Sequence, residues 1–173
     1  ALVFEDTFAF EGAWPTGQIG DVDAAYGDGL FLLAGPGSEL PTFIAPVAEP
    51  LAAASTVTVE AALTLEPYAE AGVYVGTGES ERVGAVISAD GRVAIFRDSI
   101  ESLEVIGTGS VAVTGPLRLT LTLHGSTVVA AVDGRQVVAV ALPVRAVDFG
   151  LVTWPTDVSV ARIAEFRVVA SPP

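Results

Sequence analysis

The stretch from Leu117 to Val140 constrains this chain most, because its first half alternates strictly between apolar and polar side chains. The odd positions from 117 to 123 are all leucine, and the even positions from 118 to 124 are Arg, Thr, Thr and His. A period of two places successive side chains on opposite faces of a β-strand. We therefore expect a strand in which the four leucines face a core.

The same stretch predicts a meander of three antiparallel strands. Gly125-Ser126 predicts a tight turn after the leucine strand, and Asp133-Gly134 is the strongest type of short-range hairpin signal. A third strand follows at residues 136–140. All three strands share one apolar face, so the meander must pack against a second sheet.

The rest of the chain predicts strands as well. Thr56–Leu65 alternates as clearly as the leucine strand, and no segment keeps a 3.6-residue period over three turns. Short apolar runs, separated by Gly or Pro, predict an all-β antiparallel sandwich or jelly roll of about a dozen strands. We expect residues 1–170 to form a single domain and residues 171–173 to be a tail.

Arg162 breaks the pattern of the last strand, because it occupies an otherwise apolar parity. A β-bulge changes which face the following side chains take. We therefore expect either a bulge or a buried ion pair near Arg162.

Charge and composition exclude several partners. The net charge is −13, and the basic residues are scattered arginines. Nucleic acids and anionic membrane surfaces both need clustered basic side chains, so neither is an expected partner. No apolar run approaches the roughly 18 residues of a membrane-spanning helix, so no membrane insertion is expected. Without cysteine the chain has no disulfide, no thiolate nucleophile and no cysteine zinc site.

Several stretches, taken together, resemble one family. They are FEDTF…GAW, AAYGDGLFLL, AGVYVG…RVGAVISADGRVAIFR, LRLTLTLHGSTVVAAVDGRQVVAV…VDFGLVTW and ARIAEFRV. In this order they resemble the concanavalin A-like (laminin-G/glucanase-type) sandwich domains of bacterial secreted proteins. The resemblance implies the fold but not one function, because lectins, binding modules, glycosidases and structural domains share this fold.

The resemblance departs from the family's enzymes at their catalytic strand. The glucanases carry Glu-x-Asp-x-x-Glu there, whereas this chain has Glu60 with Ala62 in place of the aspartate. Retaining glycosidases need two carboxyl groups about 5–5.5 Å apart. We therefore predict no catalytic residues, and the alternative is a glycoside hydrolase without the usual motif.

Three aspartates in the glycine-rich stretch 20–29 form the candidate metal site: Asp21, Asp23 and Asp28. Carboxylates gathered in one loop can hold Ca²⁺, although the order of an EF-hand is missing. The alternative is a solvated acidic loop. The resemblance suggests a second pair, Asp6 with Glu165, since the terminal strands of such sandwiches are often neighbours. No cofactor is required, and calcium is the one that we consider.

Aromatic side chains form the candidate ligand site. Tyr74 and Phe96 lie on the parity opposite to the inward side chains of their strands, and Trp154 begins a loop. If their strands share a sheet, the three rings could form an open platform on which sugar rings stack. The alternative is that loops cover this face and make the rings part of the core. His124, the one histidine, is expected to be an exposed turn residue.

These observations favour a non-catalytic, exported recognition module that binds carbohydrate at the cell envelope. The alternative is a structural or interaction subunit of an extracellular assembly, whose partner is another envelope protein or a second copy of the chain. Export is an expectation from Ala1, since a small first residue fits a mature chain after signal cleavage. A trimmed chain would begin in the same way.

Overall fold

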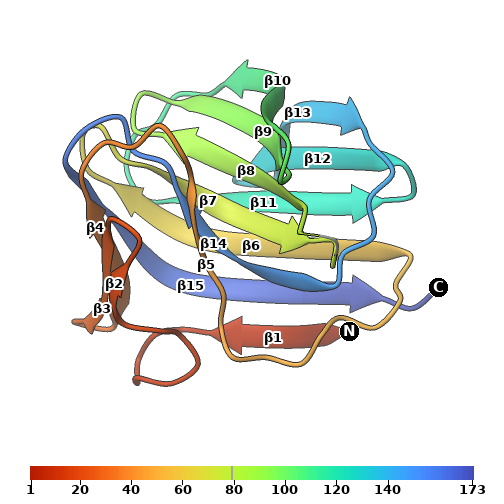
Figure 1. Cartoon of the computed structure of the whole chain (residues 1–173), viewed down its shortest axis with the longest axis horizontal. Coiled ribbons are helices and arrows are strands. Elements are labelled where there is room, and N and C mark those ends of the chain that lie inside the picture. The colour runs from red at the N-terminus through yellow and green to blue at the C-terminus, as the bar shows by residue number, and fades with distance from the viewer. Residues whose placement is uncertain (79) are drawn as a thin grey trace.

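The computed structural model describes residues 1–78 and 80–173 as two antiparallel β-sheets packed face to face (Figure 1). These residues form fifteen strands and no helix. In the described part of the chain there is accordingly no helix that is long and apolar enough to cross a membrane. The predicted all-β antiparallel sandwich is confirmed, with more strands than expected.

The larger sheet lies behind the smaller one in Figure 1 and is called the back sheet. Its order is β13 (Arg135–Ala141), β12 (Thr127–Val132), β11 (Leu117–His124), β6 (Thr56–Leu65), β15 (Ser159–Ser171), β4 (Leu30–Gly35), β3 (Val22–Gly27) and β2 (Gly17–Ile19), and β1 (Leu2–Asp6) also pairs with β15. The smaller sheet is called the front sheet. Its order is β10 (Leu103–Ser110), β9 (Arg92–Asp98), β8 (Arg82–Ser88), β7 (Glu70–Gly76), β14 (Asp148–Thr153) and β5 (Thr42–Ile44).

The leucine strand β11 lies at the centre of the interface between the sheets. Its four leucines are buried and face β7 and β8 across the sandwich, whereas Thr120 and Thr122 on its other face are only half-buried. β6 and β12 pair with β11 on either side and bury the same parity. The predicted register of the meander is therefore confirmed.

An aromatic group closes the core beside β1. The Trp14 ring meets the Phe166 ring edge-on at 4.9 Å, and Phe8 stacks on Phe31 at 5.4 Å. The Tyr26 hydroxyl accepts a hydrogen bond from the Trp14 N–H at 3.2 Å. Trp14 and Tyr26 are therefore parts of the core and its adjoining turn.

The irregularity expected near Arg162 is a β-bulge. The pairing of β15 with β6 shifts between Ile163 and Glu165. Odd-numbered residues of β15 face the core up to Ile163, and even-numbered residues face it from Phe166 onward. Arg162 pairs with Glu66 at 2.7 Å, but both side chains are partly exposed, so this ion pair is not buried. β15 continues to Ser171, and the predicted tail is shorter by that residue.

We expect Leu121→Ala to lower the free energy of unfolding by about 2–5 kcal/mol, because it opens a cavity between the sheets. The matched control is Thr120→Ala, on the same strand but the opposite face, which should cost less than about 1 kcal/mol. Chemical denaturation measures both values. A loss below about 0.5 kcal/mol for Leu121→Ala would show that this side chain is not in the core.

Candidate functional site

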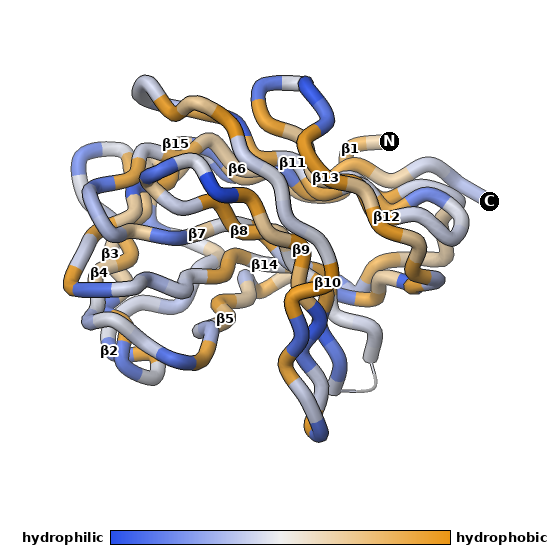
Figure 2. Tube along the Cα trace, turned by 90° about the horizontal axis from the view of Figure 1, so that it is seen from above, coloured by the Kyte–Doolittle hydropathy of each residue, from blue (hydrophilic) through white to orange (hydrophobic). Residues whose placement is uncertain are grey.

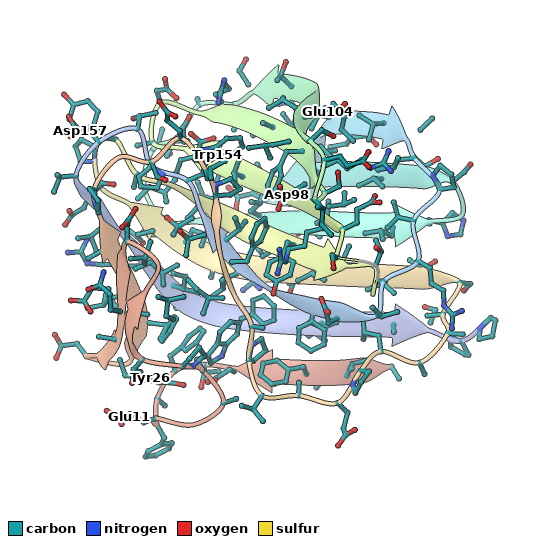
Figure 3. The ribbon with its side chains drawn as sticks, viewed as in Figure 1. Glu11, Tyr26, Asp98, Glu104, Trp154 and Asp157 are labelled. Atoms are coloured by element: carbon teal, nitrogen blue, oxygen red, sulfur yellow. The ribbon has the colours of Figure 1, made fainter. Side chains whose placement is uncertain are left out.

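The predicted ligand residues come from the front sheet, from β7, from β9 and from the segment after β14, where Figure 3 labels Trp154. On β7, Val73 and Val75 point into the core, so Tyr74 points outward. Gly84 of β8 pairs with Tyr74 on one side and with Phe96 of β9 on the other. The two rings therefore flank one glycine on the same face.

Four rings on this face form what we call the aromatic cluster: Phe43, Tyr74, Phe96 and Trp154. Phe43 meets Tyr74 edge-on at 5.0 Å, and Trp154 meets Phe96 edge-on at 5.6 Å. The expectation that Tyr74, Phe96 and Trp154 share one face is therefore confirmed. Phe43, from β5, was missed because a short strand between prolines shows no clear parity.

The prediction of an open platform is wrong for two of the three rings. Tyr74 is 3% exposed and Phe96 is 0% exposed. A Cβ at Gly84 would lie 2.6 Å from the Phe96 ring, and a Cβ at Gly150 would lie 2.6 Å from the Tyr74 ring. Because glycine has no side chain, the Phe96 ring can lie over Gly84 and the Tyr74 ring over Gly150. Trp154 and Phe43 are only partly buried, so they are the rings of the cluster that a ligand can touch.

A polar group borders the cluster at one end, around Arg82 of β8. The Arg82 guanidinium lies 4.4 Å from the centre of the Phe43 ring and 3.8 Å from the Asp98 carboxylate. Burial, reinforced by the nearby Asp148 carboxylate, raises the pKa of Tyr74 to about 12, against the opposing effect of Arg82. At neutral pH the Tyr74 hydroxyl is protonated, as in an ordinary tyrosine, and can donate a hydrogen bond.

A pocket of about 790 Å³ lies at the other end, where the β6–β7 turn, the β8–β9 hairpin and the β14–β15 loop meet. We call it the end pocket; residues that give it its chemistry are Tyr68, Glu70, Ser88, Asp90, Arg92 and Thr156. It adjoins the cluster, because the Trp154 N–H donates to the Glu70 carbonyl at 2.8 Å. Figure 3 shows Trp154 on the face and Asp157, which follows Thr156, at this end of the molecule.

Glu70 is the unusual group of the end pocket, since it is only 3% exposed. Its carboxylate receives one hydrogen bond from the described residues, from Arg92 at 3.4 Å. Burial raises the pKa of Glu70, and the Asp90 carboxylate adds to this, while Arg92 opposes it. Asp90 is exposed, and hydrogen bonds from the Ser88 hydroxyl and the Arg92 N–H lower its pKa.

Tyr68 presents its ring at the rim of the pocket and is 62% exposed. Its backbone has a φ of 67°, a region that bulky side chains rarely adopt and that is often found at functional sites. The Thr156 N–H donates to the Tyr68 carbonyl at 3.2 Å and holds this turn. Sequence reasoning missed Tyr68. A signal was present, however, because Glu70 has the same outward parity as Tyr74 and shows that this end of the aromatic face is polar.

The predicted acidic loop is a hairpin in the structure. Asp23 lies on β3, while Asp21 and Asp28 lie in the turns at its two ends. The prediction that they share one loop is therefore wrong, because the apolar side chains Val22 and Ala24 pack inward and form a strand. The described residues contain no group of three acidic or histidine side chains placed to hold an ion. Calcium binding by these aspartates stays a prediction.

Asp6 and Glu165, the second candidate calcium site, each bind another residue of the chain. Asp6 accepts a hydrogen bond from the Phe8 N–H at 2.7 Å, and Glu165 pairs with Arg118 at 2.8 Å. Arg118 also pairs with Glu60 at 3.0 Å, and its hydrogen bonds lower the pKa of Glu165. Arg118 thus joins the carboxylates of Glu60 and Glu165 on the back sheet, and the lowered pKa of Glu165 does not suit a general acid.

His124 lies exposed at the end of β11, as expected. Its Nδ1 is 2.6 Å from the Thr56 hydroxyl. That contact ties β11 to β6.

The chain matches no protein-family model and no curated protein. Solved structures show its fold to be that of the concanavalin A-like lectins and glucanases. A carbohydrate-binding module from Bacillus subtilis, CBM66, is 17% identical with a TM-score of 0.61, over 95% of this chain and 96% of that one.

Two further structures mark the range of this fold. A B. subtilis protein of unknown function with a galectin-like fold has a TM-score of 0.72 and 10% identity, over 100% of this chain and 98% of its own. A Bacillus licheniformis β-glucanase has a TM-score of 0.66 and 9% identity, over 96% and 97% of the two chains. Binding proteins and enzymes are both similar to this chain, so these comparisons fix the fold alone.

The raised pKa of Glu70 leads to a test of the end pocket by pH. The folded state binds this proton more tightly than the unfolded state does, so ionising Glu70 costs stability as the pH rises through its folded pKa. Gln cannot ionise. We therefore expect Glu70→Gln to gain stability relative to the wild type between acidic and neutral pH.

Denaturation midpoints across this range measure that difference, and Glu49→Gln, on an exposed segment, controls for the loss of one negative charge. A difference between Glu70→Gln and wild type that stays constant with pH would show that Glu70 is not perturbed by burial.

Proposed function

We propose that this chain is a non-catalytic carbohydrate-binding module that works outside the cell, at the cell envelope, and holds glycan on the outer face of the front sheet. The aromatic cluster is the observation that carries the proposal, with Trp154 and Phe43 as its accessible rings. Aromatic rings present an apolar surface to the C–H face of a sugar, while a few fixed polar groups bind its hydroxyls.

The polar groups needed for orientation border the cluster at both ends. Arg82 and Asp98 lie at one end, and Glu70 and Arg92 lie at the other. Tyr74 and Phe96 support the outer rings from beneath, because they are buried and held against glycines. A ring held in place loses little conformational entropy on binding, which favours affinity. The similarity to a carbohydrate-binding module is consistent with this proposal.

The alternative of a protein-assembly subunit is favoured by a different surface. Figure 2 shows the β9–β10 hairpin projecting from the front sheet, and the exposed side chains Ile100 and Val105 lie on it. Two scattered side chains are normal for a soluble surface, however, and stable interfaces bury far more area. Glycan binding is therefore the function that we favour.

Trp154→Ala should weaken retention on the polysaccharide that binds the wild type by about ten-fold or more, because loss of a central Trp contact has effects of that size. The control is Phe10→Ala, which removes a ring 86% exposed in the N-terminal loop and should leave retention unchanged. Affinity electrophoresis against a panel of polysaccharides makes the comparison, with circular dichroism to verify folding. No retention of the wild type by any glycan, or equal retention of both variants, would contradict the proposal.

Hydrolysis has one observation in its favour, since Glu70 and Asp90 line one pocket with pKa shifts in opposite directions. Such pairs often supply the acid and the base of a glycosidase. Glu70 is nevertheless paired with Arg92, so we expect no release of reducing ends from oligosaccharides. Turnover by the wild type that Glu70→Gln abolishes would make the chain an enzyme.

A further inference from the structure

The end pocket has a charge imbalance that points to a particular ligand chemistry. The charged side chains among its described lining residues are Glu70, Asp90 and Arg92, two acids against one base. Arg92 is already bound by Glu70, and its side chain is largely exposed to water. The pocket is therefore net negative in a protein whose net charge is −13.

The buried carboxylate of Glu70 is incompletely compensated. Among the described residues its one side-chain donor is Arg92 at 3.4 Å, which is long for a hydrogen bond between charged groups. A carboxylate removed from water costs free energy unless donors or a cation replace its hydration. Glu70 lines the pocket, so a ligand in the pocket can supply what the chain does not.

We propose that the end pocket binds the protonated amine of an amino sugar, with Glu70 and Asp90 as counter-ions and the Tyr68 ring as the stacking surface. This inference rests on the proposed glycan binding and names the class of sugar. The exposed Tyr68 ring lies at the pocket rim, where it can contact both the sugar and its ammonium group.

Other glycan classes fit this pocket less well. A uronic acid or a sulfated sugar would bring a negative charge to two carboxylates, which the local and the overall charge both oppose. A neutral sugar could donate hydroxyl hydrogen bonds to Glu70, but it brings no positive charge to offset the two carboxylates. An N-acetylated amine is uncharged, so it would not compensate Glu70.

The experiment compares fully deacetylated chito-oligosaccharides with N-acetylated and glucose oligomers of the same length, by isothermal titration calorimetry at moderate salt. The deacetylated oligomers should bind the wild-type chain, and the N-acetylated and glucose oligomers should bind about ten-fold more weakly or worse. Glu70→Gln and Tyr68→Ala should each weaken the binding of the deacetylated oligomers by a similar factor. Glu49→Gln removes the same charge outside the pocket and should have no such effect.

Three results would overturn the inference, and a fourth would overturn the proposed function alone. Equal losses in Glu70→Gln and Glu49→Gln, or equal binding of a lysine oligomer, would mean attraction of any cation to an acidic surface. Equal binding of the N-acetylated oligomers would show that the ammonium charge of the sugar does not contribute to binding. If Trp154→Ala abolishes retention on a neutral glycan while the deacetylated oligomers do not bind, the proposed function stands and this inference fails. If the pocket binds the amine but Trp154→Ala changes nothing, the cluster is not the glycan site.

Discussion

The central strands of the front sheet, β7 and β8, are buried on both of their faces, and the rest of the structure depends on that constraint. The inner face of the sheet packs on the leucines of β11, and its outer face carries buried rings as well. A strand buried on both sides has little room for large side chains on every position. Gly84 and Gly150 supply the room. A Cβ atom at either glycine would be too close to the ring that lies over it, Phe96 over Gly84 and Tyr74 over Gly150. The polar groups are consequently displaced to the two ends of the face.

This arrangement gives the outer face a rigid apolar centre between two polar borders. Rings that are already packed need little reordering when a ligand arrives, which suits the proposed binding of a flat, partly apolar molecule such as a sugar. The borders differ in kind. Arg82 is stacked on a ring and paired with Asp98, whereas Glu70 is buried and accepts a long hydrogen bond from Arg92. Specificity for a charged substituent is therefore expected at the Glu70 end.

Much of the fold could be predicted from the sequence, because the burial of one face leaves a period of two in the residues. The leucines of β11 were found in this way, and so was an irregularity near Arg162, for which the sequence left a bulge and a buried ion pair open. The site was harder to predict. Parity correctly placed Tyr74 and Phe96 on one face, but whether that face is open depends on chain segments distant in sequence, such as β5 with Phe43. The end pocket, too, joins turns that are far apart along the chain, so no local pattern marks it.

The measurement that tests the central claim most directly is a nuclear magnetic resonance titration of the isotope-labelled chain with an oligosaccharide that it retains. The account predicts that the shifted signals come from the outer positions of β7, β8 and β9 and from the indole N–H of Trp154. Saturable shifts confined to the back sheet, around Arg118 and Glu165, would contradict it and would move the binding site to the opposite side of the sandwich.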